Sequence, residues 1–263
     1  MNARIINDIV EFTNDDGHLC ATYHYNDGPK SFFRGLFTPR GRDVVAFPPP
    51  DHPHHRGLQY ALCTKDVNFW EEKPGPPPLP ALVGRQHNQS IERFQRGDEA
   101  GFSQVLIWCD DVKKDTFHET RTVSVQKTPS AYVWTWETRL TALREGVVLI
   151  KGPWAARIFD GSVAYYGLGL RLNNAFFTEE SQLFVNGKLT RVDEALGQVG
   201  QSFALRAGGV QVMFEQSQDP LYVNLRDFVF MSLSPIPTTV DERPVPKGET
   251  IDERYVITVS DTT

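Results

Sequence analysis

The chain has 263 residues, of which 40% are hydrophobic and 23% charged, so it has enough apolar surface to form a large core. It carries 27 Lys plus Arg against 33 Asp plus Glu, a formal net charge of −6. This balance offers no basic surface for phosphate backbones or anionic lipid, so we expect neither nucleic acid nor a membrane as partner. The longest apolar run, Val105–Cys109, is far shorter than the ~20 residues of a membrane span.

The N-terminal segment and the cysteines favour a cytoplasmic location. Met1–Val10 contains Arg4 and Asp8, so it lacks the apolar core of a secretory signal. The cysteines are odd in number, widely spaced and form no Cys-x-x-Cys pair, which is typical of reduced, buried thiols. They are Cys20, Cys63 and Cys109.

Alternation of polar and apolar residues with period two recurs along the chain, and helical periodicity is nearly absent, which predicts an all-β protein. We expect strands over Ile5–Phe12, Leu19–Tyr25, Ser31–Phe37, Phe102–Asp110, Phe117–Gln126, Ala131–Leu140, Val163–Leu172, Val210–Gln216, Phe228–Leu233 and Ile251–Val259. The one expected helix is short, near Val192–Leu196. In Ala131–Leu140 the alternation places Tyr132, Trp134 and Trp136 on one face, which we expect to be core.

Turn residues separate most of these strands, and we expect turns at Asn14–Gly17, Asn26–Pro29, Asn186–Lys188 and Lys247–Glu249. Two proline-rich stretches, Phe47–Arg56 and Pro74–Pro80, cannot lie in central strands because proline donates no ladder hydrogen bond. Many strands without interleaved helices predict a large two-sheet antiparallel β-sandwich, which we expect to form a single domain over residues 1–263.

The densest group of reactive side chains is Asp51-His52-Pro53-His54-His55-Arg56-Gly57, which we call the histidine loop. Prolines restrict its backbone to extended conformations and hold the imidazoles in fixed directions, which suits acid–base chemistry or metal binding. The alternative is a polar surface loop whose histidines only cap backbone groups. Asn68 and Trp70 follow closely and are expected to line the same mouth.

A divalent metal is one possibility for this loop. His52 and His54 have the His-x-His spacing that puts two imidazoles on one side of an extended chain, and His55 is a further candidate ligand. Cupins, which share this spacing, also need a Glu a few residues later, whereas Leu58–Tyr60 occupies that place here. A further ligand would have to come from elsewhere in the fold.

A second group of candidates lies on the expected strands. Glu119 and Arg121 share a face of Phe117–Gln126, where they form either a reactive pair or a purely structural one. Gly167, Gly169 and Arg171 project from one face of a later strand, and two glycines beside an arginine leave room for a ligand. The alternative is a bulged strand with a solvent-facing arginine.

The histidine loop, continued by Asp66–Trp70, resembles a motif of a bacterial family commonly labelled PmoA-like, and Glu119–Arg121 and Tyr166–Arg171 look like later motifs of that family. The resemblance implies a relative of the galactose-mutarotase and sugar-lyase supersandwiches with a role in carbohydrate catabolism. The histidine pair and carboxylate base of the mutarotases, however, have no residue-by-residue counterpart in this sequence.

From the histidine loop and this resemblance we expect an enzyme that acts on a small carbohydrate, an oxidised (3-keto) sugar or glycoside, by proton abstraction and elimination or hydration. The alternatives are an aldose mutarotase or epimerase and a non-catalytic carbohydrate-binding module. His54, His55 and, alternatively, Glu119 are the expected catalytic residues. The expected substrate-binding residues are Asp51, His52, Arg56, Asn68, Trp70, Arg121 and Arg171, with Trp70 stacking on the sugar and the arginines clamping an oxyanion.

Overall fold

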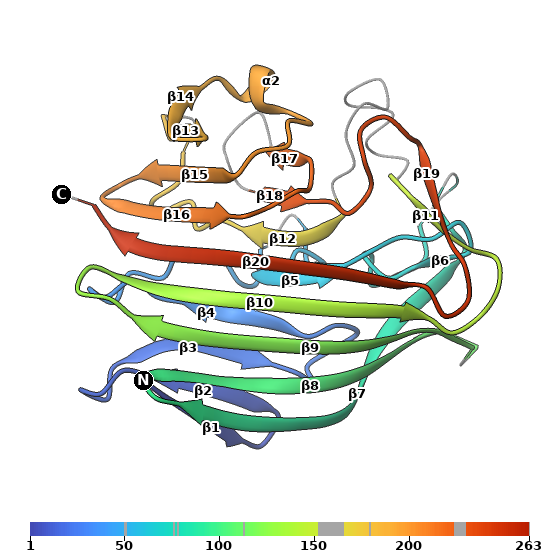
Figure 1. The fold of residues 1–263 in the computed structure, drawn as a ribbon, viewed down its shortest axis with the longest axis horizontal. Coiled ribbons are helices and arrows are strands. Elements are labelled where there is room, and N and C mark those ends of the chain that lie inside the picture. Colours follow the sequence, from blue (N-terminus) through green and yellow to red (C-terminus); the bar gives the residue numbers. More distant parts are fainter. Residues whose placement is uncertain are drawn as a thin grey trace.

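The computed structural model describes residues 1–49, 52–75, 77, 79–112, 114–151, 166–178, 180–223 and 230–262. These residues form two large sheets that lie one behind the other, as Figure 1 shows for β10 and β20 in front of β4 and β5. The expected all-β, two-sheet sandwich is therefore confirmed. No helix in the described part of the chain is long and apolar enough to cross a bilayer.

The first sheet has eight strands, in the spatial order β1 (Asn2–Ile6), β2 (Ile9–Thr13), β3 (Leu19–His24), β4 (Phe32–Leu36), β5 (Leu58–Ala61), β12 (Gly167–Arg171), β18 (Phe230–Leu233) and β17 (Leu221–Val223). The second sheet has ten, in the order β14 (Lys188–Thr190), β13 (Gln182–Val185), β15 (Ser202–Ala207), β16 (Val210–Glu215), β20 (Thr250–Asp261), β10 (Ala131–Ala142), β9 (Asp115–Lys127), β8 (Glu99–Asp110), β7 (Leu82–Arg96) and β6 (Val67–Asn68). A two-stranded ribbon pairs β11 (Val147–Ile150) with β19 (Glu242–Val245), and the short helix α2 spans Val192–Ala195.

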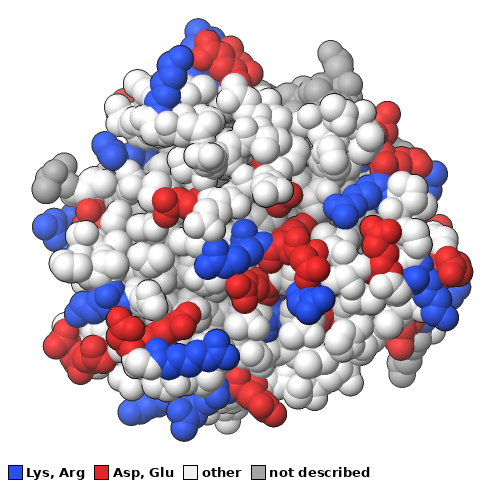
Figure 2. Space-filling view, viewed as in Figure 1, with Lys and Arg blue, Asp and Glu red and all other residues white. Residues whose placement is uncertain are grey.

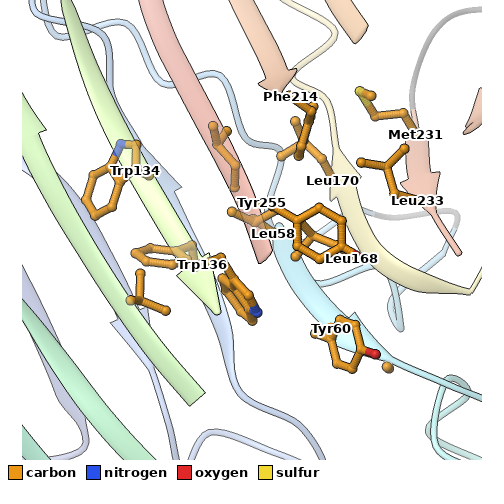
Figure 3. Packing of buried hydrophobic residues seen from close by; sticks show 14 of the residues in the cluster. Leu58, Tyr60, Trp134, Trp136, Leu168, Leu170, Phe214, Met231, Leu233 and Tyr255 are labelled. Carbon is orange, nitrogen blue, oxygen red and sulfur yellow. The ribbon is translucent and has the colours of Figure 1, made fainter. Parts of the chain in front are cut away.

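Alternate side chains of both sheets fill the space between them. The expected aromatic face of β10 is buried, with Trp134 and Trp136 exposing 2% and 0% of their surface. Figure 3 shows these rings in one cluster with Leu168 and Leu170 of β12 and with Tyr255 of β20. The period-two pattern of the sequence thus places one face of each sheet in the core.

Two expectations for the strands need correction. The single strand expected over Ile5–Phe12 is a hairpin of β1 and β2, which turns at Asn7 with a φ of 52°. Asparagine tolerates this left-handed conformation, so one residue suffices to break the run. The sequence pattern also missed several strands, and the longest of them is β7, whose outer half is mostly exposed and polar and therefore shows no apolar alternation. The starts of the expected strands Val163–Leu172 and Phe228–Leu233 lie outside the described residues.

The outer face of the eight-stranded sheet positions the candidate site. Because Leu168 and Leu170 point into the core, Gly169 and Arg171 lie on the opposite face of β12. Gly169 pairs with Gln59 of β5, and Arg171 pairs with Phe230 of β18, so these side chains share that face. The histidine loop enters β5 directly and lies over the same region.

Candidate functional site

The histidine loop ends in a tight turn that is anchored on the sheet. The backbone N–H of His55 donates to the carbonyl of His52 at 2.9 Å, and the N–H of Arg171 donates to the carbonyl of Gly57 at 2.7 Å. Gly57 has a φ of 55°, and a Cβ there would come within 1.9 Å of the Phe33 carbonyl oxygen. Glycine is therefore required at this position for the loop to pass so close to β4.

The structure brings the three imidazoles of the loop together. The ring of His55 lies parallel to that of His52 at a centroid distance of 4.9 Å and edge-on to that of His54 at 4.4 Å. His55 also stacks on Phe230 at 4.3 Å and meets Trp70 edge-on at 5.7 Å. His55 is buried in this stack, whereas His52 is exposed and His54 lies between these extremes.

His54 forms a dyad with a carboxylate. Its Nδ1 lies 3.1 Å from Oε2 of Glu71, and each side chain keeps 15% of its surface exposed. A carboxylate at this distance favours the tautomer with the proton on Nδ1, in which Nε2 is the basic nitrogen. The pair therefore has the geometry of an oriented general base that a ligand can reach.

Asn68 sets the position of Glu71. Its side-chain oxygen accepts hydrogen bonds from the backbone N–H groups of Trp70 and Glu71, both at 2.9 Å. Trp70 is fully buried and lies over Gly169, where an added Cβ would approach its ring within 2.8 Å. Trp70 therefore packs against the ring of His55, and Asn68 fixes the turn that carries Glu71.

Charged side chains lie next to the Trp70–Glu72 segment. The Arg56 guanidinium binds both carboxylate oxygens of Glu72, with 2.9 Å from Nη2 to Oε2, and also donates to the carbonyl of Asp27 at 2.8 Å. The ammonium group of Lys30 donates to the carbonyl of Trp70 and lies 4.0 Å from Glu72. Burial lowers the pKa of Lys30 to about 8, against the opposing charge of Glu72.

His55 is held neutral by its surroundings. Burial lowers its pKa well below the usual 6.5, and the neighbouring His54, His52 and Arg171 act in the same direction. Arg171, 4% exposed on β12, is thus close enough to the imidazoles for its charge to act on them. The structure brings Arg171 into the site with the histidines.

Glu119 and Arg121 lie elsewhere, in the core between the two sheets. Both side chains are fully buried and form a two-bond ion pair at 2.8 Å for each bond. Glu119 also accepts from the indole N–H of Trp108 at 2.8 Å, and Arg121 donates to the hydroxyl of Tyr23 at 2.8 Å. The structure does not place this pair on the face that carries the histidine loop, so we leave both residues out of the candidate site.

Asp51, an expected substrate-binding residue, lies outside the described residues. Among the residues that are described, no three His, Cys, Asp or Glu side chains come together in an arrangement that would hold a metal ion. The expectation of a divalent metal therefore gains no support from the described part of the histidine loop.

Sequence reasoning missed the acidic and basic partners of the loop. Glu71 and Glu72 directly follow Trp70, and that acidic pair was a usable signal beside a histidine-rich loop. Lys30 carried no such signal because it lies between an expected turn and an expected strand, and only the fold brings it to Trp70 and Glu72.

Comparison with known proteins places the chain in a family. The profile of a "Family of unknown function (DUF6807)" matches residues 10–263. The chain belongs to DUF6807. A search of curated proteins gives no match to this DUF6807 chain.

Solved structures show similar folds at low identity. The chain is similar to the galactosidase domain of the alpha-galactosidase-sucrose kinase AgaSK, with 11% identity and a TM-score of 0.51 over 97% of this chain and 41% of that one. It thus spans less than half the length of that structure. A galactose mutarotase related enzyme from Lactobacillus acidophilus aligns with 99% of this chain and 97% of its own at 7% identity and a TM-score of 0.40.

Proposed function

We propose that the protein is a carbohydrate-processing enzyme that acts on an oxidised (3-keto) sugar or glycoside by proton abstraction followed by elimination or hydration. The observation that carries this proposal is the His54–Glu71 dyad, an oriented and partly exposed base on a face that also holds Arg171. The fold similarity to a galactosidase domain and the PmoA-like resemblance of the histidine loop support the substrate class.

The chemistry of a 3-keto sugar fits an imidazole base. The ketone acidifies the C–H bond at C2, and Nε2 of His54 takes that proton while the C–H electrons form an enolate. Glu71 stabilises the resulting imidazolium, and the positive charge of Arg171 favours the enolate oxygen. The enolate electrons then form the C1–C2 double bond, the C1–O bond breaks, and the departing oxygen takes the proton back from His54. Addition of water across the new double bond completes a hydrolysis.

His52 and His55 have different roles in this scheme. His55 is neutral and buried, so it supports the ring of His54 and excludes water from one side of it. His52 is the exposed imidazole of the loop and is the second candidate for protonating the leaving group. Trp70 acts from below by holding His55 in place.

Incubation of the purified protein with matched 3-keto and plain glycosides in deuterated water, followed by NMR, tests the proposal. We expect deuterium at C2 and cleavage with the keto substrates only, and loss of both in His54→Gln. His18→Gln, which changes an exposed histidine outside the site, is the matched control. Elemental analysis of the same sample measures any bound metal.

Other results would replace the proposal. Exchange of anomers without deuterium uptake at carbon would make the protein a mutarotase. Sugar binding without any turnover would make it a carbohydrate-binding module, and full activity of His54→Gln would remove the dyad from the mechanism.

A further inference from the structure

A polar pocket opens where β20 of the ten-stranded sheet loses its hydrogen-bonded neighbour on one side. β16 pairs with β20 only up to Glu215 opposite Val256, and the chain then turns away at Gln216, which has a φ of 57°. Among the described strands, none pairs with the first half of β20 on that side. The gap holds a pocket of about 420 Å³, whose lining includes Gln216, Gln218, Asp219, Arg243, Glu253 and Arg254.

The two faces of β20 differ sharply beside this gap. Asp252 and Arg254 point outward and pair with Arg139 and Glu137 of β10, and Figure 2 shows acidic and basic side chains gathered over this part of the sheet. These pairs are exposed and contribute little to stability. By the alternation of the strand, Glu253 and Tyr255 point the other way, toward the space between the sheets.

Two carboxyl groups of the pocket lining meet on one buried phenol behind it. The hydroxyl oxygen of Tyr255 lies 2.6 Å from Oε2 of Glu253 and also within hydrogen-bond distance of Oδ2 of Asp219. A phenol has one proton to donate, so the second contact is satisfied when one carboxyl group carries a proton and donates it to the phenol oxygen. Burial raises the pKa of Asp219 to about 6 and that of Glu253 well above 4.5, in agreement with a retained proton.

Tyr60 supplies an independent observation from the opposite sheet. It is fully buried on β5, and its hydroxyl makes a hydrogen bond with the carboxyl group of Glu253. Burial raises the pKa of Tyr60 well above 10, and the neighbouring Glu253 carboxyl group acts in the same direction. Figure 3 shows Tyr60 and Tyr255 in the same cluster between the sheets. Glu253 therefore connects the lining of the pocket with polar side chains in the core between the sheets.

We propose that this pocket, which we call the Glu253 pocket, is a second ligand site, and that it binds a neutral polyhydroxylated molecule such as a sugar or cyclitol. Its lining offers carboxyl, amide and guanidinium groups, so ligand hydroxyls find both hydrogen-bond donors and acceptors. With one proton held between the carboxyls, the remaining negative charge is balanced by Arg243. The volume is in the range of small-molecule sites.

The charge balance separates this ligand class from others. A free anion would face the carboxylate at the inner end of the pocket, and a cation would have to displace the shared proton. The Glu253 pocket shares no lining residue with the histidine loop, so the inference does not depend on the 3-keto-sugar reaction.

Saturation-transfer NMR and calorimetry of the full chain with D-glucose, D-galactose and myo-inositol test the proposal. We expect at least one of them to bind, and Glu253→Gln to weaken that binding by about 10-fold or more, the value of a hydrogen bond to a charged or buried group. Tyr60→Phe, which removes the hydrogen bond that positions Glu253, should weaken it as well. Glu194→Gln, an exposed carboxylate on α2, should bind as the unmodified protein does. His54→Gln should also keep this binding, even where it abolishes turnover.

Several outcomes would overturn the proposal. Absence of binding by all three neutral probes, or binding only of D-glucuronate or Ca²⁺, would reject a neutral polyol site. Binding that survives Glu253→Gln but is lost in His54→Gln would place the ligand at the histidine loop instead. A thermal melt of each variant identifies misfolding, and Tyr60→Phe provides a second test because it leaves both carboxyls in place.

Discussion

At the scale of single residues, the contact between His54 and Glu71 separates an oriented base from a surface histidine. A glutamine at position 71 can still accept a hydrogen bond from Nδ1–H, so it preserves the tautomer but removes the charge that stabilises an imidazolium. We therefore expect Glu71→Gln to lower kcat by about 10²-fold and Glu71→Ala to lower it further. Steady-state kinetics with a 3-keto glycoside would measure this, and equal rates for all three proteins would contradict the role of Glu71.

For the buried pair of Glu119 and Arg121 we expect substitutions to lower stability rather than catalytic rate. Removal of one partner leaves an uncompensated charge in the core, so we expect Arg121→Met to lower the free energy of unfolding by about 3–5 kcal/mol. Urea denaturation gives this value. The double variant Glu119→Leu/Arg121→Met should recover much of the loss because no charge remains buried. A double variant that folds but has lost turnover would show that the pair has a catalytic role.

At the scale of elements, β12 joins the core to the site through alternating residues. Gly169 has no side chain, and a Cβ there would lie 2.7 Å from the ring of Phe230 and 2.8 Å from that of Trp70. Both rings support His55. We expect Gly169→Ala to cost about 1–3 kcal/mol of stability through overpacking and to lower kcat by moving the histidine stack. Denaturant titration and kinetics of the same sample measure both, and an unchanged kcat would mean that the stack does not position His54.

Polar–apolar alternation in the sequence predicted some strands and failed for others. Alternation was sufficient for β10, whose aromatic residues all fall on the buried face. It failed for β7, because a strand that is exposed along much of its length has no apolar face to reveal it. It also failed at Asn7, where a single residue with positive φ turns one apparent strand into two.

At the scale of the whole molecule, the candidate sites were likewise predictable from the sequence only where their residues are neighbours in the chain. The histidine loop was evident from composition, since its residues are neighbours in the chain. Its contacts with Arg171 and Phe230 depend on the pairing of β5, β12 and β18, and no local pattern encodes that pairing. The Glu253 pocket was missed entirely, because Asp219, Glu253 and Tyr60 are far apart in the sequence and each is unremarkable by itself.

The free energy of unfolding should depend on pH through two opposing effects, one from His55 and one from the carboxyl pair of Asp219 and Glu253. His55 has a lowered pKa, so the unfolded chain binds a proton below about 6.5 that the native protein refuses, and stability falls as the pH drops below that value. Asp219 and Glu253 have raised pKa values, so the unfolded chain loses protons that the native protein retains. Their contribution to stability is present below about pH 4 and is lost as the pH rises toward 6 and beyond.

Two variants separate these effects in urea denaturation between pH 4 and 8. Glu253→Gln should gain stability relative to the unmodified protein as the pH rises from 4.5, because it no longer holds a carboxyl group in a site that disfavours its ionised form. His55→Gln should gain relative stability as the pH falls below 6.5, because glutamine cannot be protonated in the unfolded chain. Glu194→Gln, an exposed carboxylate, should run parallel to the unmodified protein throughout. Parallel curves for all three variants would show that neither buried group changes its proton affinity on folding.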